Sequence, residues 1–280
     1  MRSRQRDGHG RSDRSGPVEG EYPVDTGTVR LTRDGADPDA WTVWVNGVPS
    51  SPVNLRDPTV LDFEYLQWMA DVVEVAAAPA PQPLDVVHLG GGGCALARHL
   101  DAVRPGSRQV VVELDAELNR LVRGWFDLPR SPRLRLQSGD AREGLARRPD
   151  ASADVVVRDV FAGSRTPSHL TTAEFLACVA RVLRPGGVYL ANVADPGTLA
   201  ELRAEIASAT AVFESVAVLA EPAALRRRRW ANAVLVGSHA LLPIAALARR
   251  AASGAVRARL VHGDALVQLR AGARPRHDPR

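Results

Sequence analysis

The segment from Leu84 to Glu113 constrains the fold of this chain more than any other stretch. It begins with the apolar run Leu84–Leu89, which leads into four consecutive glycines, Gly90–Gly93. A stretch with helical spacing follows over Ala95–Val103, and the apolar run Gln109–Glu113 ends on an acid. Because glycine has no Cβ atom, it lets a chain turn tightly from a strand into a helix and approach a ligand closely. The order of these pieces predicts a strand, a glycine turn, a helix and a second strand.

The same alternation of strand and helix continues along the chain. Three further apolar runs, RLRLQS, DVVVRDV and VYLANV, are separated by stretches with helical periodicity. Such strands are typical of a parallel sheet that is covered on both faces. Ala211–Leu219 and Trp230–Val236 lack a long helix between them, so we expect an antiparallel hairpin at the sheet edge. The predicted fold class is α/β: a seven-stranded, methyltransferase-like Rossmann sheet with helices on both faces, plus a small N-terminal β unit.

Composition and patterning divide the chain into four parts. These are a disordered arm (residues 1–20), a small β-hairpin domain (21–57), a Rossmann-like methyltransferase-fold domain (58–240) and a C-terminal extension (241–280). The arm has too few apolar residues to offset the entropy of ordering. Around the turn pair Asn46-Gly47, alternation puts Trp41, Val43 and Val45 on one face. A helix over Pro58–Ala78 opens the main domain, and the extension is expected to contain a strand around Leu260–Leu269 and a frayed end.

Charge and cysteine content narrow the classes of partner. All 36 basic residues are Arg, and the formal net charge is only +4, which is too modest to indicate nucleic-acid binding. Cys94 and Cys178 lie far apart and lack the spacing of a metal site, so no metal is predicted. No stretch resembles a signal sequence or a membrane span. We therefore expect a cytoplasmic protein that binds neither a membrane nor a metal.

The glycine turn and the acid after it predict a nucleoside-binding site. Gly90, Gly91, Gly92 and Gly93 would bring the backbone against the ligand, and Glu113 would accept hydrogen bonds from both ribose hydroxyls. A strand-to-helix turn with a solvated Glu is the purely structural alternative. The spacing of Gly90, Gly92 and Ala95 also fits the GxGxxA form of a nicotinamide-binding turn. These residues alone do not separate nicotinamide from adenosyl cofactors.

Two downstream features favour an adenosyl cofactor. Ser138-Gly139-Asp140-Ala141 follows the third strand, where a methyltransferase-type site needs an acid beside the adenine, so Asp140 and Ala141 join the predicted site. Arg184-Pro185-Gly186-Gly187 precedes the fifth strand as a helix-stop turn common in that superfamily. An N-cap for the following helix is the alternative role of Asp140. The predicted cofactor is S-adenosylmethionine or its decarboxylated form.

Several motifs between about Trp44 and Asp195 resemble, in order, those of the spermidine synthase (polyamine aminopropyltransferase) family. VNGVPSS resembles that family's N-terminal hairpin, DFEY the helix leading into its core, HLGGGG its glycine turn and VVELD its ribose-binding strand. GDARE resembles its adenine-side turn, RDVF the end of its fourth strand and HLTTAEF the segment after its active-site loop. The resemblance implies aminopropyl transfer from decarboxylated S-adenosylmethionine to a small diamine. It also implies a possible homo-oligomer.

The resemblance implies further site residues, and it also shows where this sequence departs from the family's pattern. Asp159 matches the acid that ends the fourth strand and joins the predicted cofactor-binding residues, and Tyr65 matches the helix tyrosine. The family's catalytic acid is replaced by Ala162, and the acid that contacts the aminopropyl amine is replaced by Gly93. Asp195 closes the fifth strand and is a candidate substitute base, with an N-cap before the next helix as the alternative.

The expected function follows from these matches and departures. Asp159, Tyr65 and Asp195 are the candidate catalytic residues, and Asp62, Glu64 and Asp71 are either extra negative charge for a cationic amine or a solvated helix face. Aminopropyl transfer to a diamine is the predicted activity. Methyl transfer from S-adenosylmethionine and a binding protein without catalysis are the alternatives, since the expected base is missing.

Overall fold

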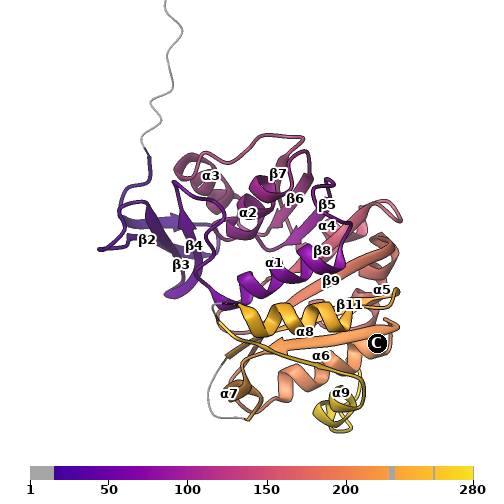
Figure 1. Cartoon of the computed structure of the whole chain (residues 1–280). Coiled ribbons are helices and arrows are strands. Elements are labelled where there is room, and N and C mark those ends of the chain that lie inside the picture. Colours follow the sequence, from indigo (N-terminus) through magenta and orange to yellow (C-terminus); the bar gives the residue numbers. More distant parts are fainter. Residues whose placement is uncertain (1–15, 227–230, 255, 280) are drawn as a thin grey trace, which may run out of the picture.

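The computed structural model describes residues 16–226, 231–254 and 256–279, and arranges them as two β-sheets with helices around the larger one (Figure 1). The smaller sheet is antiparallel in the order β1-β2-β3-β4. Its strands are β1 (Gly20–Val24), β2 (Gly27–Arg33), β3 (Ala40–Val45) and β4 (Val48–Asn54). Trp41 and Val43 of β3 are buried on one face, as the alternation predicts. Most of the predicted arm, residues 1–15, lies outside the described residues, and Gly20 already belongs to β1.

The larger sheet has eight strands in the described residues, in the order β12-β10-β11-β9-β8-β5-β6-β7. They are β5 (Asp85–Leu89), β6 (Arg108–Glu113), β7 (Leu134–Ser138), β8 (Ala153–Arg158), β9 (Leu183–Asp195), β10 (Ser215–Ala220), β11 (Ala231–Ser238) and β12 (Arg259–His262). Strands β5 to β9 are mutually parallel. Strand β11 inserts antiparallel between β9 and β10. The predicted methyltransferase-like α/β sheet is confirmed, with one strand more than predicted.

The eighth strand comes from the predicted C-terminal extension. Strand β12 pairs antiparallel with β10, so the predicted terminal hairpin is present but does not form the sheet edge. The expected strand over Leu260–Leu269 stops at His262, and helix α9 (Gly263–Arg270) follows. Gly263 has φ +55°, a left-handed conformation that ends an extended strand. The first residue of the other predicted strand, Trp230, lies outside the described residues.

Helices cover both faces of the larger sheet (Figure 1). One face packs against α1 (Glu64–Ala76), α2 (Ala95–Val103) and α8 (Ile244–Ser253). The other packs against α4 (Ala141–Ala146), α5 (Ala173–Val182), α6 (Ala200–Thr210) and α9. Helix α3 (Ala116–Trp125) and the short η1 (Ser168–Leu170) and α7 (Pro222–Leu225) complete the described set. Val86 and Val87 enter opposite cores, which explains why the central strands are apolar throughout.

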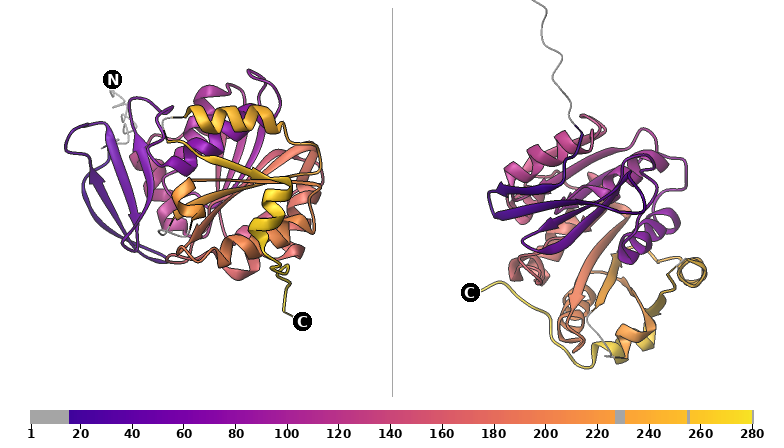
Figure 2. Two further views of the ribbon diagram at one scale, coloured as in Figure 1. Left: turned by 60° about the horizontal axis from the view of Figure 1, so that its bottom comes forward. Right: turned by 90° about the vertical axis from the view of Figure 1, so that its left-hand side faces the viewer.

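The small sheet rests on α2 and α3, beside the larger sheet (Figure 2). The turn between β1 and β2 contacts the start of α3, where Asp25 accepts hydrogen bonds from the Ala116 and Glu117 amides at 2.8 and 3.1 Å. Thr26 donates from its amide and its hydroxyl to Asp115, both at 2.8 Å, while Asp115 itself caps α3. The small sheet is therefore bonded to the segment that follows strand β6.

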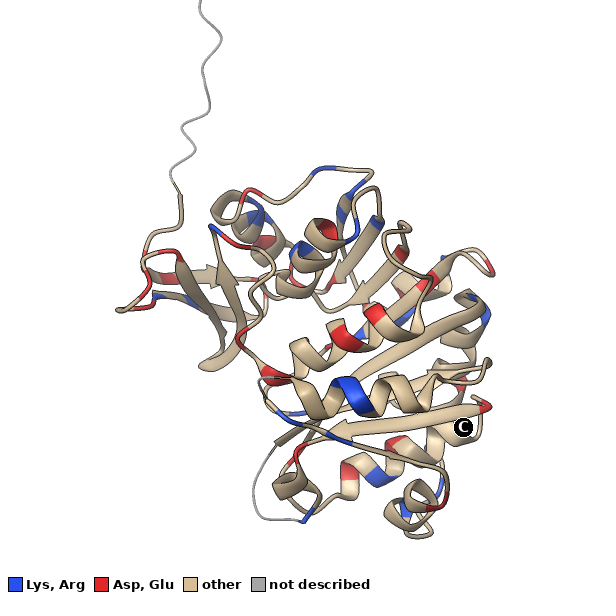
Figure 3. Cartoon of the chain, viewed as in Figure 1, with Lys and Arg blue, Asp and Glu red and all other residues tan. Residues whose placement is uncertain are grey.

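Acidic and basic residues are distributed over helices, strands and loops throughout the fold (Figure 3). Arg250 of α8 binds Asp71 of α1 at 2.6 Å, next to the apolar contact between the two helices. Asp71 is thus a structural partner of α8, which corrects its grouping with Asp62 and Glu64 as charge for an amine. Every helix in the described ranges is too short or too polar to cross a bilayer.

A buried ion pair joins strand β8 to helix α6. The guanidinium of Arg158 is fully buried and binds Glu205, with Nη2 and Oε2 2.8 Å apart. It also donates to the carbonyl groups of Leu170 and Asn192. Burial alone would lower the pKa of Arg158, but the charge of Glu205 outweighs it, so the pKa is raised and the guanidinium stays charged. The pair therefore holds β8, β9, η1 and α6 together at the end of the sheet that carries Asp159.

Replacing Glu205 by Gln should lower the free energy of unfolding by about 3 kcal/mol, because it leaves the buried Arg158 charge without its counter-charge. Urea unfolding followed by circular dichroism measures this loss. Arg120→Gln, which removes an exposed pair with Glu117 on α3, should leave the unfolding midpoint nearly unchanged. Equal midpoints for both variants would contradict the structural role of the buried pair.

Candidate functional site

The glycine turn lies at the carboxyl end of β5, between β6 and β8. Gly90 has φ +88°, and a Cβ atom there would lie 2.1 Å from the carbonyl oxygen of Asp159. The Gly90 amide donates to the Val112 carbonyl, and the Asp159 amide donates to the Leu89 carbonyl, both at 2.8 Å. Three strand ends therefore meet at one glycine without a side chain. Cys94 caps α2 in a left-handed conformation and is buried, in keeping with a packing role.

Glu113, at the end of β6, contacts the glycine turn directly. Its Oε2 accepts hydrogen bonds from the amides of Gly91 at 2.8 Å and Gly92 at 3.3 Å. The structure thus brings together the turn and the acid predicted to hold a ribose. The next residue, Leu114, follows the strand end directly and has 61% of its surface exposed. Sequence reasoning missed Leu114 because an apolar residue after a strand carries no signal of its own.

Asp140 and Ala141 lie at the start of α4, across the end of β7 from Glu113. The Gly139 amide donates to the Glu113 carbonyl at 2.9 Å and ties the two positions together. Asp140 Oδ1 accepts hydrogen bonds from the Arg142 and Glu143 amides, while Oδ2 lies 2.9 Å from His169 Nε2. Burial alone would raise the pKa of Asp140, but the Glu143 amide and His169 outweigh it, so the pKa is lowered. The capping contacts are present, and the carboxylate stays ionised.

Asp159 forms the centre of a second polar group, at the end of β8. Tyr65 Oη donates to its Oδ2 at 3.0 Å, and Asn192 Nδ2 donates to its Oδ1 at 2.9 Å. Burial of the carboxyl group raises the pKa of Asp159, although these hydrogen bonds and Arg158 oppose the shift. Burial and the charge of Asp159 raise the pKa of Tyr65 well above 10. A carboxyl group with a raised pKa can hold a proton nearer to neutral pH.

Asn192 is the residue of this group that sequence analysis missed. It is 2% exposed on β9, and its Oδ1 has no hydrogen-bond partner among the described residues. In the flipped orientation of the Asn192 amide, its oxygen would face a carboxylate oxygen of Asp159 and repel it. The amide nitrogen is therefore the atom that faces Asp159. The only signal in the sequence was one polar residue inside the apolar run VYLANV. A buried oxygen without a partner is free to accept a hydrogen bond from a ligand.

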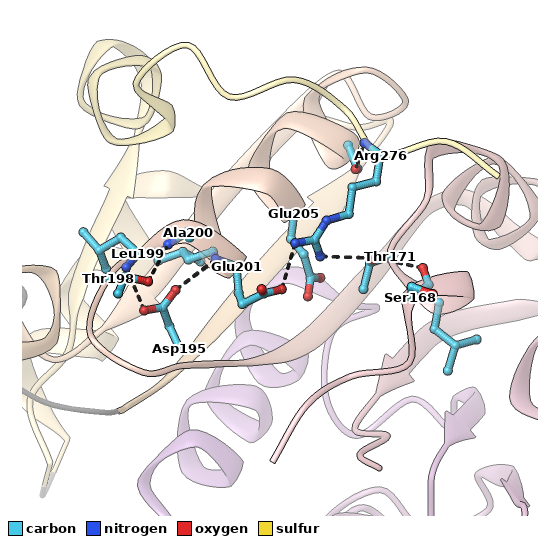
Figure 4. A network of polar contacts seen from close by, with 12 residues as sticks. Ser168, Thr171, Asp195, Thr198, Leu199, Ala200, Glu201, Glu205 and Arg276 are labelled. Carbon is cyan, nitrogen blue, oxygen red and sulfur yellow. Dashed lines mark hydrogen bonds and ion pairs between the residues drawn. The ribbon is translucent and has the colours of Figure 1, made fainter. Parts of the chain in front are cut away.

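Asp195 does not belong to this group. Its Oδ1 accepts hydrogen bonds from the Gly197 and Leu199 amides, and its Oδ2 from the Glu201 and Leu202 amides, at 2.7 to 3.3 Å. The residue is 4% exposed and lies at the start of α6 (Figure 4). Because four amides occupy its two oxygens, the prediction of a substitute base is corrected to that of a helix cap.

The small sheet fills the space beside Gly93. The Gly93 amide donates to Ser51 Oγ at 2.8 Å. A Cβ atom at Gly93 would lie 2.9 Å from Ser51 Cβ, 3.1 Å from a Val53 methyl and 3.2 Å from a Val43 methyl. The turn, Ser51 and Asp159 line a cavity of about 30 Å³. This backbone position therefore has no room for an acidic side chain.

No group of three or more His, Cys, Asp or Glu side chains in the described part of the chain is arranged to hold a metal ion. Two histidines, one buried and one partly exposed, have structural contacts. His88 Nε2 lies 2.9 Å from Gln109 Oε1, and burial lowers its pKa to about 4. His99 lies on α2 and contacts the Thr59 carbonyl.

Comparison with known proteins identifies the family. A probable spermidine synthase from Corynebacterium glutamicum is 40% identical, with a TM-score of 0.89, and the match covers 94% of this chain and 98% of that one. This chain belongs to the spermidine synthase family. The chain matches no family model.

More distant relatives agree with the fold and cover less of the sequence. The polyamine aminopropyltransferase of Vibrio vulnificus is 32% identical over 116 residues, which cover 41% of this chain and 38% of that protein. The chain thus spans well under two thirds of the length of this curated relative. Human methyltransferase-like protein 13, solved with SAH, is 22% identical, with a TM-score of 0.55 over 77% of this chain and 96% of that one. This likeness shows the methyltransferase-like fold alone.

Gly93→Ala should lower the free energy of unfolding by about 1–3 kcal/mol, because the added methyl group overpacks the contact with the small sheet. Gly124→Ala on α3 is the matched control, since a Cβ atom there meets nothing within 4 Å. The control should gain up to about 1 kcal/mol from helix propensity. Urea unfolding of both variants measures the difference, and a Gly93 variant as stable as the parent would show that the contact is loose.

Asp159→Asn should raise the stability of the protein at neutral pH. The pKa of Asp159 in the folded state lies above its usual value of 3.8. The contribution of Asp159 to the free energy of unfolding is therefore fully present below about pH 3.8 and is lost as the pH rises through the folded-state pKa. The Asn side chain has no charge to bury, so the variant should have a larger free energy of unfolding than the parent at pH 7. This difference should shrink toward pH 4. Thermal unfolding at several pH values measures it, and a pH-independent difference would refute the raised pKa.

Proposed function

We propose that this protein transfers an aminopropyl group from decarboxylated S-adenosylmethionine to a small diamine. The observation that carries the proposal is the partly buried Asp159 carboxyl group, bonded to Tyr65 and Asn192, next to the glycine turn. The relatives named as spermidine synthase and polyamine aminopropyltransferase support this activity. We also propose a cytoplasmic location, which the two free cysteines support.

The nucleoside end of the donor fits the residues around the glycine turn. The turn from Gly90 to Gly93 allows a close backbone approach, and Glu113 supplies an acceptor for the ribose hydroxyls. Asp140 offers a carboxylate, and Ala141 a backbone amide, for the edge of the adenine. The exposed apolar side chain of Leu114 would cover a face of the base.

At the other end, Asp159 is the proposed proton acceptor. The bound donor supplies an electrophilic propyl carbon next to a positively charged sulfur. When an amine nitrogen attacks that carbon, the carbon–sulfur bond breaks, its electron pair goes to sulfur, and the new ammonium must lose a proton. Asp159 is suited to take that proton because its pKa is raised by burial. Tyr65 and the free oxygen of Asn192 would orient the amine.

Methyl transfer from S-adenosylmethionine is a second candidate, and the geometry at Gly93 favours it. An acid at that position would attract the terminal amine of the decarboxylated donor and repel the carboxylate of S-adenosylmethionine. Here the small sheet occupies the space, so the chain lacks this means of discrimination. Methyl transfer also depends less on a strong base than on the alignment of the acceptor.

The test is titration calorimetry with S-adenosylmethionine, its decarboxylated form and methylthioadenosine, followed by product analysis with a panel of diamines. Preference for the decarboxylated form and an aminopropylated product would support the proposal. Equal or tighter binding of S-adenosylmethionine with a methylated product would support the second candidate. Binding without turnover would indicate a binding protein, and the absence of binding tighter than millimolar would overturn the nucleoside site itself.

Glu113→Gln should weaken the binding of methylthioadenosine by about 1–3 kcal/mol, because charged hydrogen bonds to the ribose are lost. Glu117→Gln is the matched control: it removes the same charge four residues later, on the exposed side of α3. Calorimetry of both variants, with circular dichroism to verify the fold, measures the difference. Unchanged affinity of the Glu113 variant would exclude the assigned contact.

A further inference from the structure

The last described residues cross the outside of helices α5 and α6 in an extended conformation (Figure 2). We call residues 273–279 the C-terminal strap. The carbonyl of Arg276 accepts a hydrogen bond from the Ala173 amide at 2.8 Å, and its amide donates to Ser208 Oγ at 3.0 Å. The Asp278 amide donates to Glu174 at 3.1 Å. The frayed end expected from the Arg- and Pro-rich sequence is therefore corrected, since polar contacts hold this segment in place.

The side chains of the strap bind two regions of the core. The Arg276 guanidinium pairs with Glu201 of α6 at 2.8 Å and reaches the hydroxyl of Thr171, which follows η1 (Figure 4). Asp278 binds the guanidinium of Arg142 through both oxygens. The hydrogen bond from Arg142 lowers the pKa of Asp278 to about 2, so this carboxylate is ionised at every physiological pH. The strap thus reaches the GDARE motif, in which Arg142 follows Asp140 and Ala141.

A chain of contacts continues from Arg142 to the adenine-side acid. Arg142 Nη1, which is 2.7 Å from Asp278 Oδ1, also donates to the carbonyl oxygen of His169 at 3.1 Å. The ring of His169 in turn holds Oδ2 of Asp140 at 2.9 Å. Both ends of the Arg142–Asp278 pair are partly shielded, with 28% and 32% of their side chains exposed. A bidentate arginine–carboxylate pair fixes orientation as well as distance.

We propose that Asp278 and Arg142 are positioning residues, which set the orientation of the Asp140 carboxylate through His169 and thereby favour a ligand with an exocyclic amino group. The backbone amides hold only Oδ1 of Asp140, so His169 determines the plane of the carboxylate and the direction of its remaining lone pairs. A hydrogen bond from the 6-amino group of adenine needs such a lone pair in a defined direction. This inference rests on the proposed nucleoside site.

The experiment compares methylthioadenosine with methylthioinosine, which has a carbonyl oxygen in place of the 6-amino group. Asp278→Asn should weaken the binding of methylthioadenosine by about fivefold and that of methylthioinosine by less than about twofold. Arg142→Gln, which removes both contacts of the guanidinium, should show the same pattern. His277→Gln is the matched control, because His277 lies in the strap but binds Glu174 rather than Arg142. It should leave both affinities unchanged.

Calorimetry on the full chain measures the affinities, and thermal unfolding verifies that each variant is folded. An equal loss for both nucleosides in Asp278→Asn and Arg142→Gln would mean that the strap only stabilises the fold, and would overturn the positioning role. Unchanged affinities in both variants would overturn it as well. Failure of the parent protein to bind either nucleoside would instead refute the proposed nucleoside site.

Discussion

The close approach of Gly90 to the backbone of Asp159 is the contact on which the site depends. Strand β5 lies between β6 and β8, so the chain leaving it must pass over the end of β8 without a side chain. This single contact brings the turn amides to Glu113 on one side and the Asp159 carboxyl group to Tyr65 on the other. A larger residue at Gly90 would separate the two halves of the site, because backbone atoms cannot yield.

The two halves of the site differ in how far they keep the family's pattern. On one side, Glu113 accepts a hydrogen bond from the glycine turn, and the Gly139 amide bonds the Glu113 carbonyl next to Asp140. At the reactive end, the small sheet packs on Gly93, and the Asp159 carboxyl group is bonded to an asparagine from β9. The small sheet thus takes the space that an acidic side chain at Gly93 would need. The reactive end therefore has no acidic side chain at the Gly93 position to select between donors.

Arginine is the only basic side chain besides histidine, and the structure uses it to connect elements. Arg104 is buried and donates to the Ala78 and Gln82 carbonyls, which fixes the linker between α1 and β5. Arg158 joins β8 to α6, and Arg142 joins α4 to the C-terminal strap. A planar guanidinium binds several acceptors at once, which a lysine ammonium does less rigidly. Arginine side chains therefore connect the elements that surround the candidate site.

The sequence by itself determined the alternation of strands and helices, the glycine turn and the acids at the strand ends, because these depend on local spacing and burial. It also indicated the family. It did not determine the roles of Asp195 and Asn192, since a carboxylate before a helix and an amide in a strand fit several functions equally. It also did not show that strand β12 ends at His262 and pairs with β10, or that the strap is ordered. Those depend on pairings between residues far apart, such as Arg142 with Asp278, whose partners only the tertiary structure brings together.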